Sequence, residues 1–332
     1  MMKAIELTSD NTFRATKIQK PSPSKEGQDL LVKVRYTAFD TVLDYFLPKR
    51  DMGASYVRDL KSKPLILGYH YVGTVVEKSQ SVTNANVGDV VYGHLDYKPD
   101  QKQGTLSEYI LVTTDECAPA PKGVEETIAA ASTTESLTAL QALRDEGGLK
   151  AGQRVLILGA GGGVGSAAVS VARELGASSV AAVCGTKDVE RVRRLGVESV
   201  IDRHKRKGWE TDASLKGKFD LVFDASSSYS FVKYGRKWLV PGGIFVNAYP
   251  LIVEQLIFGW LWPLVTSKKM KMVNVKTRRS DLELLSSWLA SGKVEALVDS
   301  VHPISKIDEA VKRHQKGKKS GSRVVIKVEG AW

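Results

Sequence analysis

The residues best suited to bind a ligand form a run of glycines between an apolar stretch and a helical pattern. Residues 155–158 are all apolar, and residues 159–165 read Gly-Ala-Gly-Gly-Gly-Val-Gly. Residues 166–175 then place alanine, valine and leucine at the spacing of one helix face. Such a turn lets the backbone approach a pyrophosphate, to which the helix start offers free N–H groups. The pattern from Ala160 to Gly165, A-x-G-x-x-G, therefore predicts a dinucleotide site.

The residues after the next apolar run bear on the choice between NADH and NADPH. An acidic residue about 20 positions beyond the glycines ordinarily binds the ribose 2′-hydroxyl of NAD. At that position the sequence reads Gly185-Thr186-Lys187. Thr186 and Lys187 can hydrogen-bond and neutralise a 2′-phosphate, and Arg191 or Arg203 can join them in doing so. Asp188 is the counter-argument, but an acid at a helix start is also explained by the helix dipole. The sequence therefore favours NADPH over NADH.

Residues that bind zinc are sparse and scattered. A catalytic zinc site needs three convergent ligands and a structural site usually needs four. The chain has two cysteines, Cys117 and Cys184, and five histidines without paired spacing. We therefore predict no metal site and expect His70 to be a surface or packing residue. Hydride transfer would then depend on the cofactor and on hydrogen-bond donors that polarise the acceptor.

The composition is that of a globular protein with an excess of basic residues. Its 332 residues suit two domains, with 42% hydrophobic and 26% charged residues. The net charge of +11 predicts either a solvated basic face or attraction to an anionic membrane surface or polyanion. No nucleic-acid-binding motif accompanies the basic clusters, so we expect no nucleic-acid partner.

One apolar segment, residues 251–265, raises the question of a membrane. It contains Glu254 and Pro263 and is shorter than the roughly 20 residues that span a bilayer. We expect a buried helix or an inter-subunit surface, with peripheral membrane contact through Trp260 and Trp262 as the alternative. The sparse cysteines and the lack of a long apolar leader favour the cytoplasm.

The pattern of elements predicts an α/β protein of two parts. The first third contains short strand-like runs separated by Gly, Pro, Asn and Asp, which is typical of a β-rich barrel. Residues 126–144 read as mainly helical, and five apolar runs alternate with helical segments between residues 155 and 246. Such alternation predicts a doubly wound parallel sheet covered on both faces.

The ordered set of motifs resembles the medium-chain dehydrogenase/reductase superfamily, in particular its zinc-free quinone-oxidoreductase-like (zeta-crystallin-like) branch. The motifs that carry the resemblance are MKAI (2–5), VGDVVYG (87–93), GTLSEY (104–109), LTALQAL (137–143), the glycine turn, LGVESVID (195–202) and GSRVVI (321–326). The resemblance implies a GroES-like substrate domain over 1–121 and 269–332, and a Rossmann domain over 122–268. It also implies an active-site cleft between the domains and a homodimer.

The resemblance implies roles for several further residues. Thr138 should lie near the nicotinamide ribose, the loop Asn247-Ala248-Tyr249 should pass the nicotinamide, and Arg323 replaces a lysine common in relatives. The complete set of expected cofactor-binding residues is Thr138, Gly162, Gly163, Val164, Gly165, Gly185, Thr186, Lys187, Arg203, Asn247, Ala248, Tyr249 and Arg323.

Three departures from the relatives bear on chemistry. Tyr69 stands where members with catalytic zinc carry a histidine. Residues 41–44 read Thr-Val-Leu-Asp where quinone reductases show Asn-Pro-x-Asp, so their substrate contacts do not transfer directly. Glu135 replaces a small residue, which puts a carboxylate either near the cofactor cleft or on a helix surface.

These features together predict NADPH-dependent hydride transfer to a quinone or an α,β-unsaturated carbonyl compound. Tyr45 and Tyr69 are the candidate catalytic donors to the substrate oxygen, although either could equally be a core or rim tyrosine. A biosynthetic enoyl reductase is the alternative enzyme, since specificity depends on the variable rim of the cleft. A non-catalytic NADPH-binding adaptor at a membrane surface is the alternative of another class.

Overall fold

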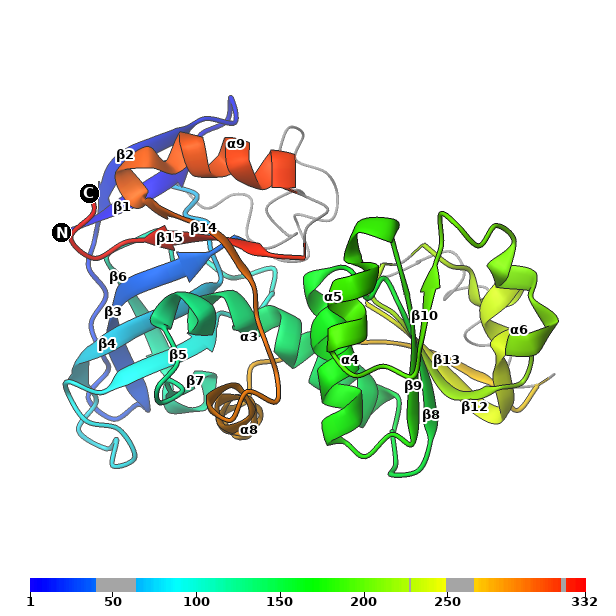
Figure 1. Ribbon diagram of the computed structural model, residues 1–332. Coiled ribbons are helices and arrows are strands. Elements are labelled where there is room, and N and C mark those ends of the chain that lie inside the picture. The colour runs from blue at the N-terminus through cyan, green and yellow to red at the C-terminus, as the bar shows by residue number, and fades with distance from the viewer. Residues whose placement is uncertain (40–63, 227, 249–265, 318–320) are drawn as a thin grey trace.

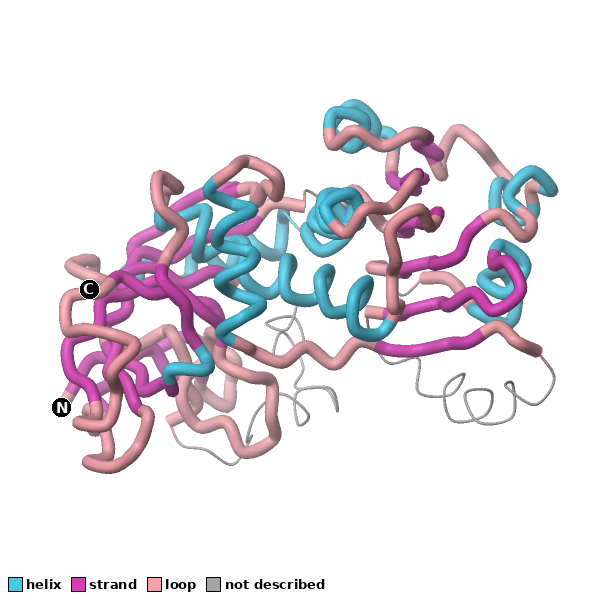
Figure 2. The backbone as a smooth tube through the Cα atoms, turned by 90° about the horizontal axis from the view of Figure 1, so that it is seen from below, coloured by secondary structure: helices cyan, strands magenta, loops and turns pink. Residues whose placement is uncertain are grey.

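The computed structural model describes residues 1–39, 64–226, 228–248, 266–317 and 321–332. Two bodies are visible in Figure 1, one built from both ends of the chain and the other from its middle. The N- and C-termini lie near each other on the outer side of the first body. Figure 2 shows helices lying between the strands of the two bodies.

The first body is β-rich and joins the two ends of the chain in one sheet. A hairpin of β1 (Met2–Leu7) and β2 (Phe13–Ile18) accompanies a seven-stranded sheet of order β14-β15-β3-β4-β5-β7, with β6 also paired to β3. β15 runs antiparallel to β3 and parallel to β14, so the chain end completes the sheet. This confirms the predicted GroES-like domain. The strands are β3 (Asp29–Ala38), β4 (His70–Lys78), β5 (Val90–His94), β6 (Tyr109–Thr113), β7 (Cys117–Pro119), β14 (Val298–Pro303) and β15 (Arg323–Lys327).

The second body is built on a parallel sheet. Its strand order is β10-β9-β8-β11-β12-β13, and every neighbouring pair is parallel. This is the order of a doubly wound dinucleotide-binding sheet, as predicted. The strands are β8 (Arg154–Leu158), β9 (Ser179–Cys184), β10 (Ser199–Asp202), β11 (Phe219–Asp224), β12 (Leu239–Asn247) and β13 (Lys269–Met272). Because β13 pairs with β12, we propose that this domain extends to Met272 rather than to residue 268.

Alternate residues of β8 pack on opposite faces of the parallel sheet. Val155 and Ile157 belong to the same core as Ala168 of α4 (Gly163–Glu174). Leu156 and Leu158 belong to the other core, whose largest buried side chains include two stacked tryptophans, Trp209 and Trp238. Both faces are therefore covered by apolar groups, which explains the uninterrupted apolar strand sequence. Among the described residues of this body, the other α-helices are short: α5 (Val189–Arg194) and α6 (Arg236–Trp238).

Helix α3 (Glu126–Leu140) packs against both bodies. It contacts β3, β4 and β5 on one side and α4 on the other, and it continues as a π-helical turn over Gln141–Glu146. Every residue from Ala129 to Leu140 is buried, so a helix rich in small residues on all sides is required here. The Asp281 carboxylate of α8 (Arg279–Ala290) accepts from Gln141 Nε2 at 2.9 Å and thereby fixes the helix end. On the outer side, α9 (Ile307–Gly317) packs on β14 and β15.

Residues 251–265, the apolar segment, lie outside the described residues. Within the described ranges, no helix combines the length and the apolarity needed to cross a bilayer.

Both cysteines are expected to resist thiol reagents. Cys117 and Cys184 are unpaired and buried, and burial raises their thiol pKa to about 12 and about 11. Because the thiolate is the reactive species, each thiol should react at pH 8 at least about 100-fold more slowly in the folded protein than in urea. A colorimetric disulfide reagent measures both rates. Rapid reaction of one thiol without urea would show that its burial is incomplete in solution.

Candidate dinucleotide site

The glycine turn connects the end of β8 to the start of α4. Gly159 takes a φ of +77°, in the left-handed region open to glycine. Its carbonyl accepts from Gly162 N at 2.9 Å, and the Gly162 carbonyl accepts from Ser166 N at 2.9 Å. The helix begins at Gly163, so the N–H groups of its first turn have no intrahelical acceptor. The turn therefore presents free donors at the carboxyl edge of the sheet, where open α/β sheets bind ligands.

Gly165 is required for close packing of α4 on the turn. A Cβ atom at this position would lie 2.2 Å from the Gly159 carbonyl oxygen and 2.8 Å from Ala160 Cα. Both obstacles are backbone atoms that cannot move aside as a side chain can. At Gly162 the nearest atom to such a Cβ, the Gly159 carbonyl oxygen, would be 3.4 Å away. Of the two glycines of the A-x-G-x-x-G pattern, only the last, Gly165, is therefore crowded by backbone.

The ends of β9 and β10 bring together the residues predicted to bind a 2′-phosphate. Cys184 pairs with Asp202, and Arg203 N donates to the Cys184 carbonyl at 3.0 Å. Thr186 Oγ1 donates to Asp202 Oδ1 at 3.0 Å, which ties the two strand ends. The exposed side chains of Lys187 and Arg203 both extend from this edge. A positive group therefore lies beside Gly185 at the carboxyl end of β9.

Two neighbours of this group were not predicted. Asp202 Oδ1 also accepts from the backbone N–H of His204 at 2.9 Å. Desolvation is the largest single effect on the pKa of Asp202 and raises it, but the hydrogen bonds from His204, Thr186 and Lys205 together outweigh it, so the pKa is lowered. The His204 ring lies against Gly185, where a Cβ would be 3.4 Å from Nε2. Both residues flank Arg203 in the sequence. The contacts of Asp202 with Thr186 and of His204 with Gly185 depend on the pairing of β9 with β10, which residue order alone does not reveal.

Asp188 and Arg191 contact the glycine turn itself. Arg191 Nη2 donates to the Gly161 carbonyl at 2.7 Å and to Asp188 Oδ1 at 3.1 Å. A Cβ on Gly161 would lie 2.5 Å from Asp188 Oδ2. Of the two arginines considered for the phosphate group, Arg191 therefore supports the turn, whereas Arg203 follows Asp202, the partner of Thr186. The Asp188 carboxylate pairs with Arg191 and makes no side-chain cap at the start of α5.

The carboxyl ends of β11 and β12 form the neighbouring part of the edge. Asp224 is buried, and its carboxylate accepts from Ser226 N and Tyr229 N at 2.9 Å each. Its backbone carbonyl accepts from Ala248 N at 3.0 Å, which places the predicted residues Asn247 and Ala248 beside β11. Tyr249 lies outside the described residues. The structural role of Asp224 was not predicted, although an acid followed by serines at a strand end is a signal of such a turn.

A buried ion pair adjoins the start of α4. Glu135 of α3 is 4% exposed, and its Oε1 accepts from Arg323 Nε at the start of β15. A Cβ on Gly163 would lie 2.8 Å from both Cγ and Oε1 of Glu135. Glu135 is therefore near the predicted cofactor site and not on a helix surface. Thr138, one turn further along α3, is also buried.

The segment before β15 touches the turn a second time. Gly321 has a φ of +68°, and a Cβ there would lie 2.4 Å from the Gly161 carbonyl oxygen. Gly321 of the first body thus reaches the glycine turn, and Arg323 reaches Glu135 beside the start of α4.

Tyr69 belongs to a buried aromatic group. It is 3% exposed, stacks on His94 at a ring separation of 5.9 Å, and meets Tyr97 edge-on at 4.7 Å. Tyr69 is therefore packed as a core residue, and its role as a hydrogen-bond donor to the substrate oxygen stays a prediction. Tyr45, the other candidate donor, lies outside the described residues.

His70 was expected to be a surface or a packing residue, and the structure shows a packing residue. It is fully buried, with Nδ1 at 3.1 Å from the Ala130 carbonyl and Nε2 at 2.8 Å from Thr134 Oγ1. Donation from Nδ1 to the carbonyl lets Nε2 accept from the hydroxyl in the neutral ring. Among the residues that the structure describes, no three His, Cys, Asp or Glu side chains are grouped to hold a metal ion.

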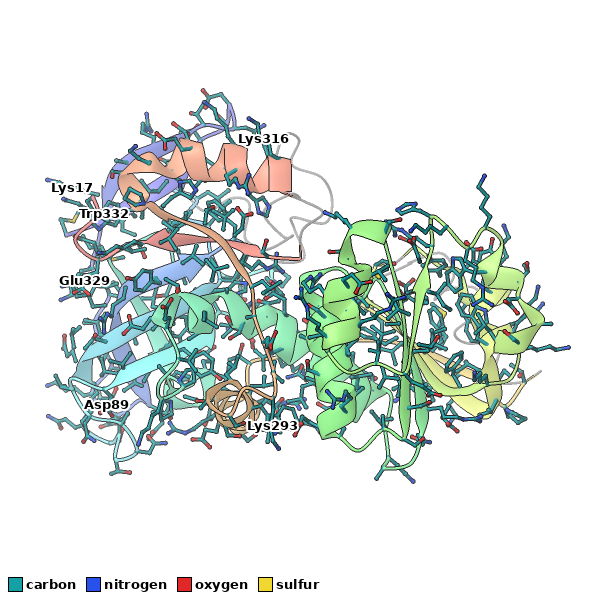
Figure 3. The ribbon with its side chains drawn as sticks, viewed as in Figure 1. Lys17, Asp89, Lys293, Lys316, Glu329 and Trp332 are labelled. Atoms are coloured by element: carbon teal, nitrogen blue, oxygen red, sulfur yellow. The ribbon has the colours of Figure 1, made fainter. Side chains whose placement is uncertain are left out.

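A cavity of about 350 Å³ lies at the outer end of the first body. Its lining includes Lys3, Lys33, Glu329 and Trp332. Figure 3 shows Glu329 and Trp332 on the side opposite the parallel sheet. The cavity is therefore separate from the glycine turn, and we do not assign it to the candidate site.

Comparison with known proteins identifies the family. The chain matches the alcohol dehydrogenase GroES-like domain over residues 26–122 and the zinc-binding dehydrogenase domain over residues 195–325. A mitochondrial NAD(P)H oxidoreductase of Bos taurus is 32% identical over 79% of this chain and 70% of its own length. The 2-methylene-furan-3-one reductase of Solanum lycopersicum is 30% identical over 98% of this chain and 79% of its own length.

A solved structure agrees with this assignment at the level of the fold. The quinone oxidoreductase from Coxiella burnetii superposes with a TM-score of 0.81, at 22% identity and 99% coverage of both chains. With the doubly wound sheet, the GroES-like sheet and these matches, the chain belongs to the medium-chain dehydrogenase/reductase superfamily, and to its quinone-oxidoreductase-like members.

Proposed function

We propose that the protein is an NADPH-dependent oxidoreductase that transfers hydride to a quinone or another α,β-unsaturated carbonyl compound without a catalytic metal. The observation that carries the proposal is the glycine turn at the carboxyl edge of the parallel sheet, next to the cationic group Lys187 and Arg203. The turn offers donors for a pyrophosphate, and the cations offer a site for the 2′-phosphate. When bound, the nicotinamide supplies the hydride.

The proposed acceptor class follows from chemistry and from the relatives. The Solanum lycopersicum relative is named for reduction of a methylene-furanone, which is an exocyclic enone. A quinone is likewise a carbonyl conjugated to a carbon–carbon double bond. In both, hydride addition to an electron-poor carbon puts negative charge on an oxygen, which a hydrogen-bond donor stabilises. Tyr45 and Tyr69 are our candidate donors. The second candidate function is a biosynthetic enoyl reductase that acts on one particular enone. The single substrate named for the Solanum lycopersicum relative favours it.

The proposed independence from zinc rests on the donor set. Thiolates and imidazoles are the usual ligands of zinc in such enzymes. Cys117 ends up in β7 and Cys184 at the end of β9, in different bodies of the molecule. His70 and His94 are buried and contact threonine side chains. Tyr69, between the glycine and His70, replaces the histidine expected of zinc-dependent members.

We further propose that the protein works in the cytoplasm as a homodimer and makes peripheral membrane contact. Two buried, unpaired thiols suit a reducing compartment. The net charge of +11 suits attraction to an anionic membrane surface.

Turnover of NADPH by the pure protein tests the proposed function. We expect several quinones or enones to be reduced, with kcat/KM for NADPH at least about tenfold above that for NADH, as expected for one lost charge-assisted interaction. Prior treatment with a strong chelator should leave the rate unchanged. Binding of NADPH without turnover of any acceptor would favour the adaptor. Binding of neither dinucleotide would show that the proposal is wrong.

A further inference from the structure

The Glu135 carboxylate is an unusual feature of the candidate site. Its Oε1 is paired with Arg323, but its Oε2 is buried and has no hydrogen-bond partner in the described part of the chain. The two side chains are only 6% and 11% exposed. A buried carboxylate oxygen without a donor is costly, so its presence calls for a role.

The position of Glu135 suggests what that role is. Its carboxyl group lies beside Gly163, the first residue of the 12-residue helix α4. The start of such a helix attracts anions through its free N–H groups and its dipole. The carboxylate therefore stands next to the place that the proposed function gives to the pyrophosphate, and it carries charge of the same sign.

Arg323 is the cation that pairs with the first of these anions, the Glu135 carboxylate. Its guanidinium has five N–H donors in a planar fork, and Nε is used on Glu135. An arginine of this geometry can bond a carboxylate along one edge and a phosphate along another. While Glu135 stays ionised, its charge cancels that of Arg323, and a pyrophosphate gains less from the pair.

We propose that Glu135 is an internal competing anion of the dinucleotide site, which orients Arg323 toward the turn and at the same time weakens pyrophosphate binding. The inference rests on the proposed function, because it presupposes a dinucleotide at the glycine turn. It assigns Glu135 as a positioning residue that sets cofactor affinity. A lower affinity favours release of the oxidised dinucleotide after each turnover.

The test compares E135Q with wild type in NADPH binding. Glutamine keeps an acceptor for Arg323 Nε and removes the charge, so we expect the Kd for NADPH to fall by about tenfold, the size of one like-charge repulsion in a partly buried site. Adenosine 2′-monophosphate has no phosphate at the turn, and its Kd should not change. The matched control is E198Q, an exposed glutamate just before the amino end of β10, which should leave both constants unchanged.

The outcomes separate this inference from the proposed function. Unchanged or weaker binding of NADPH by E135Q would overturn the inference while the function stands. Absence of NADPH binding in both proteins would overturn the function. If E135Q binds NADPH and the wild type does not, the role of Glu135 as a competing anion is supported, and the proposed NADPH-dependent turnover by the wild type is contradicted. If E135Q fails to fold, R323Q provides the test, because loss of the cation must weaken NADPH binding and leave adenosine 2′-monophosphate binding intact. Equal weakening of both ligands would mark the pair as structural.

Discussion

Replacing Gly165 with alanine is expected to lower the free energy of unfolding by about 3 kcal/mol, the upper part of the usual range for overpacking. The new methyl group would lie 2.2 Å from the Gly159 carbonyl oxygen, so α4 must move away from the turn. That movement displaces the N–H groups of the helix start, and dinucleotide binding should be lost as well. Urea unfolding followed by circular dichroism measures the first effect, and fluorescence titration with NADPH measures the second.

The adjacent glycine supplies the control for this experiment. Gly162 has a φ of −86°, which any residue adopts, and the nearest atom to an added Cβ would be 3.4 Å away. We expect Gly162→Ala to change the free energy of unfolding by less than about 1 kcal/mol. Equal losses in the two variants would show that the crowding at Gly165 is relieved in solution.

Reversing two charges at the ends of β9 and β10 is expected to have the largest effect on binding. In K187E/R203E, carboxylates replace both cations of the proposed 2′-phosphate site. Each charge-assisted hydrogen bond contributes about 1.5–3 kcal/mol, so the Kd for NADPH should rise by at least about 100-fold. NADH lacks the 2′-phosphate and should bind within about threefold of its wild-type Kd, the change expected from long-range charge alone. Parallel titrations with the two dinucleotides measure the difference.

A second double variant controls for net charge. Lys216 and Lys218 are exposed and precede β11 at the amino edge of the sheet, opposite the candidate site. K216E/K218E makes the same change in total charge and should leave both Kd values nearly unchanged. Equal weakening of NADH and NADPH in K187E/R203E would mean that the cations act on the whole dinucleotide and not on its 2′-phosphate.

The parts of this site that are local in sequence could be predicted from the sequence. The glycine turn can be recognised because its strand, its seven glycine-rich positions and its helix are neighbours along the chain. The cationic residues were predicted because they follow a recognisable strand end. The chain-end contribution to the first sheet was predicted from family resemblance alone, since nothing local indicates that β15 pairs with β3.

The parts that could not be predicted depend on contacts between distant segments. Glu135 had two interpretations, and only the packing of α3 against α4 and β15 distinguishes them. Thr186 bonds Asp202 because β9 and β10 pair in one register, which apolar periodicity does not specify. Asp188 was explained by the helix dipole, with the ribose as the alternative, whereas the structure pairs it with Arg191 and places it beside Gly161.

The antiparallel pairing of β15 with β3 determines the order in which the molecule can be assembled during synthesis. Ala38 pairs with Val325, so the edge of β3 near Ala38 lacks this neighbour until Val325 has been translated. The parallel sheet, by contrast, draws all its strands from one continuous stretch between Arg154 and Met272. The dinucleotide-binding domain can therefore fold on the ribosome first. The pairing of β15 with β3 then joins the two chain ends in the first sheet and brings Arg323 to Glu135.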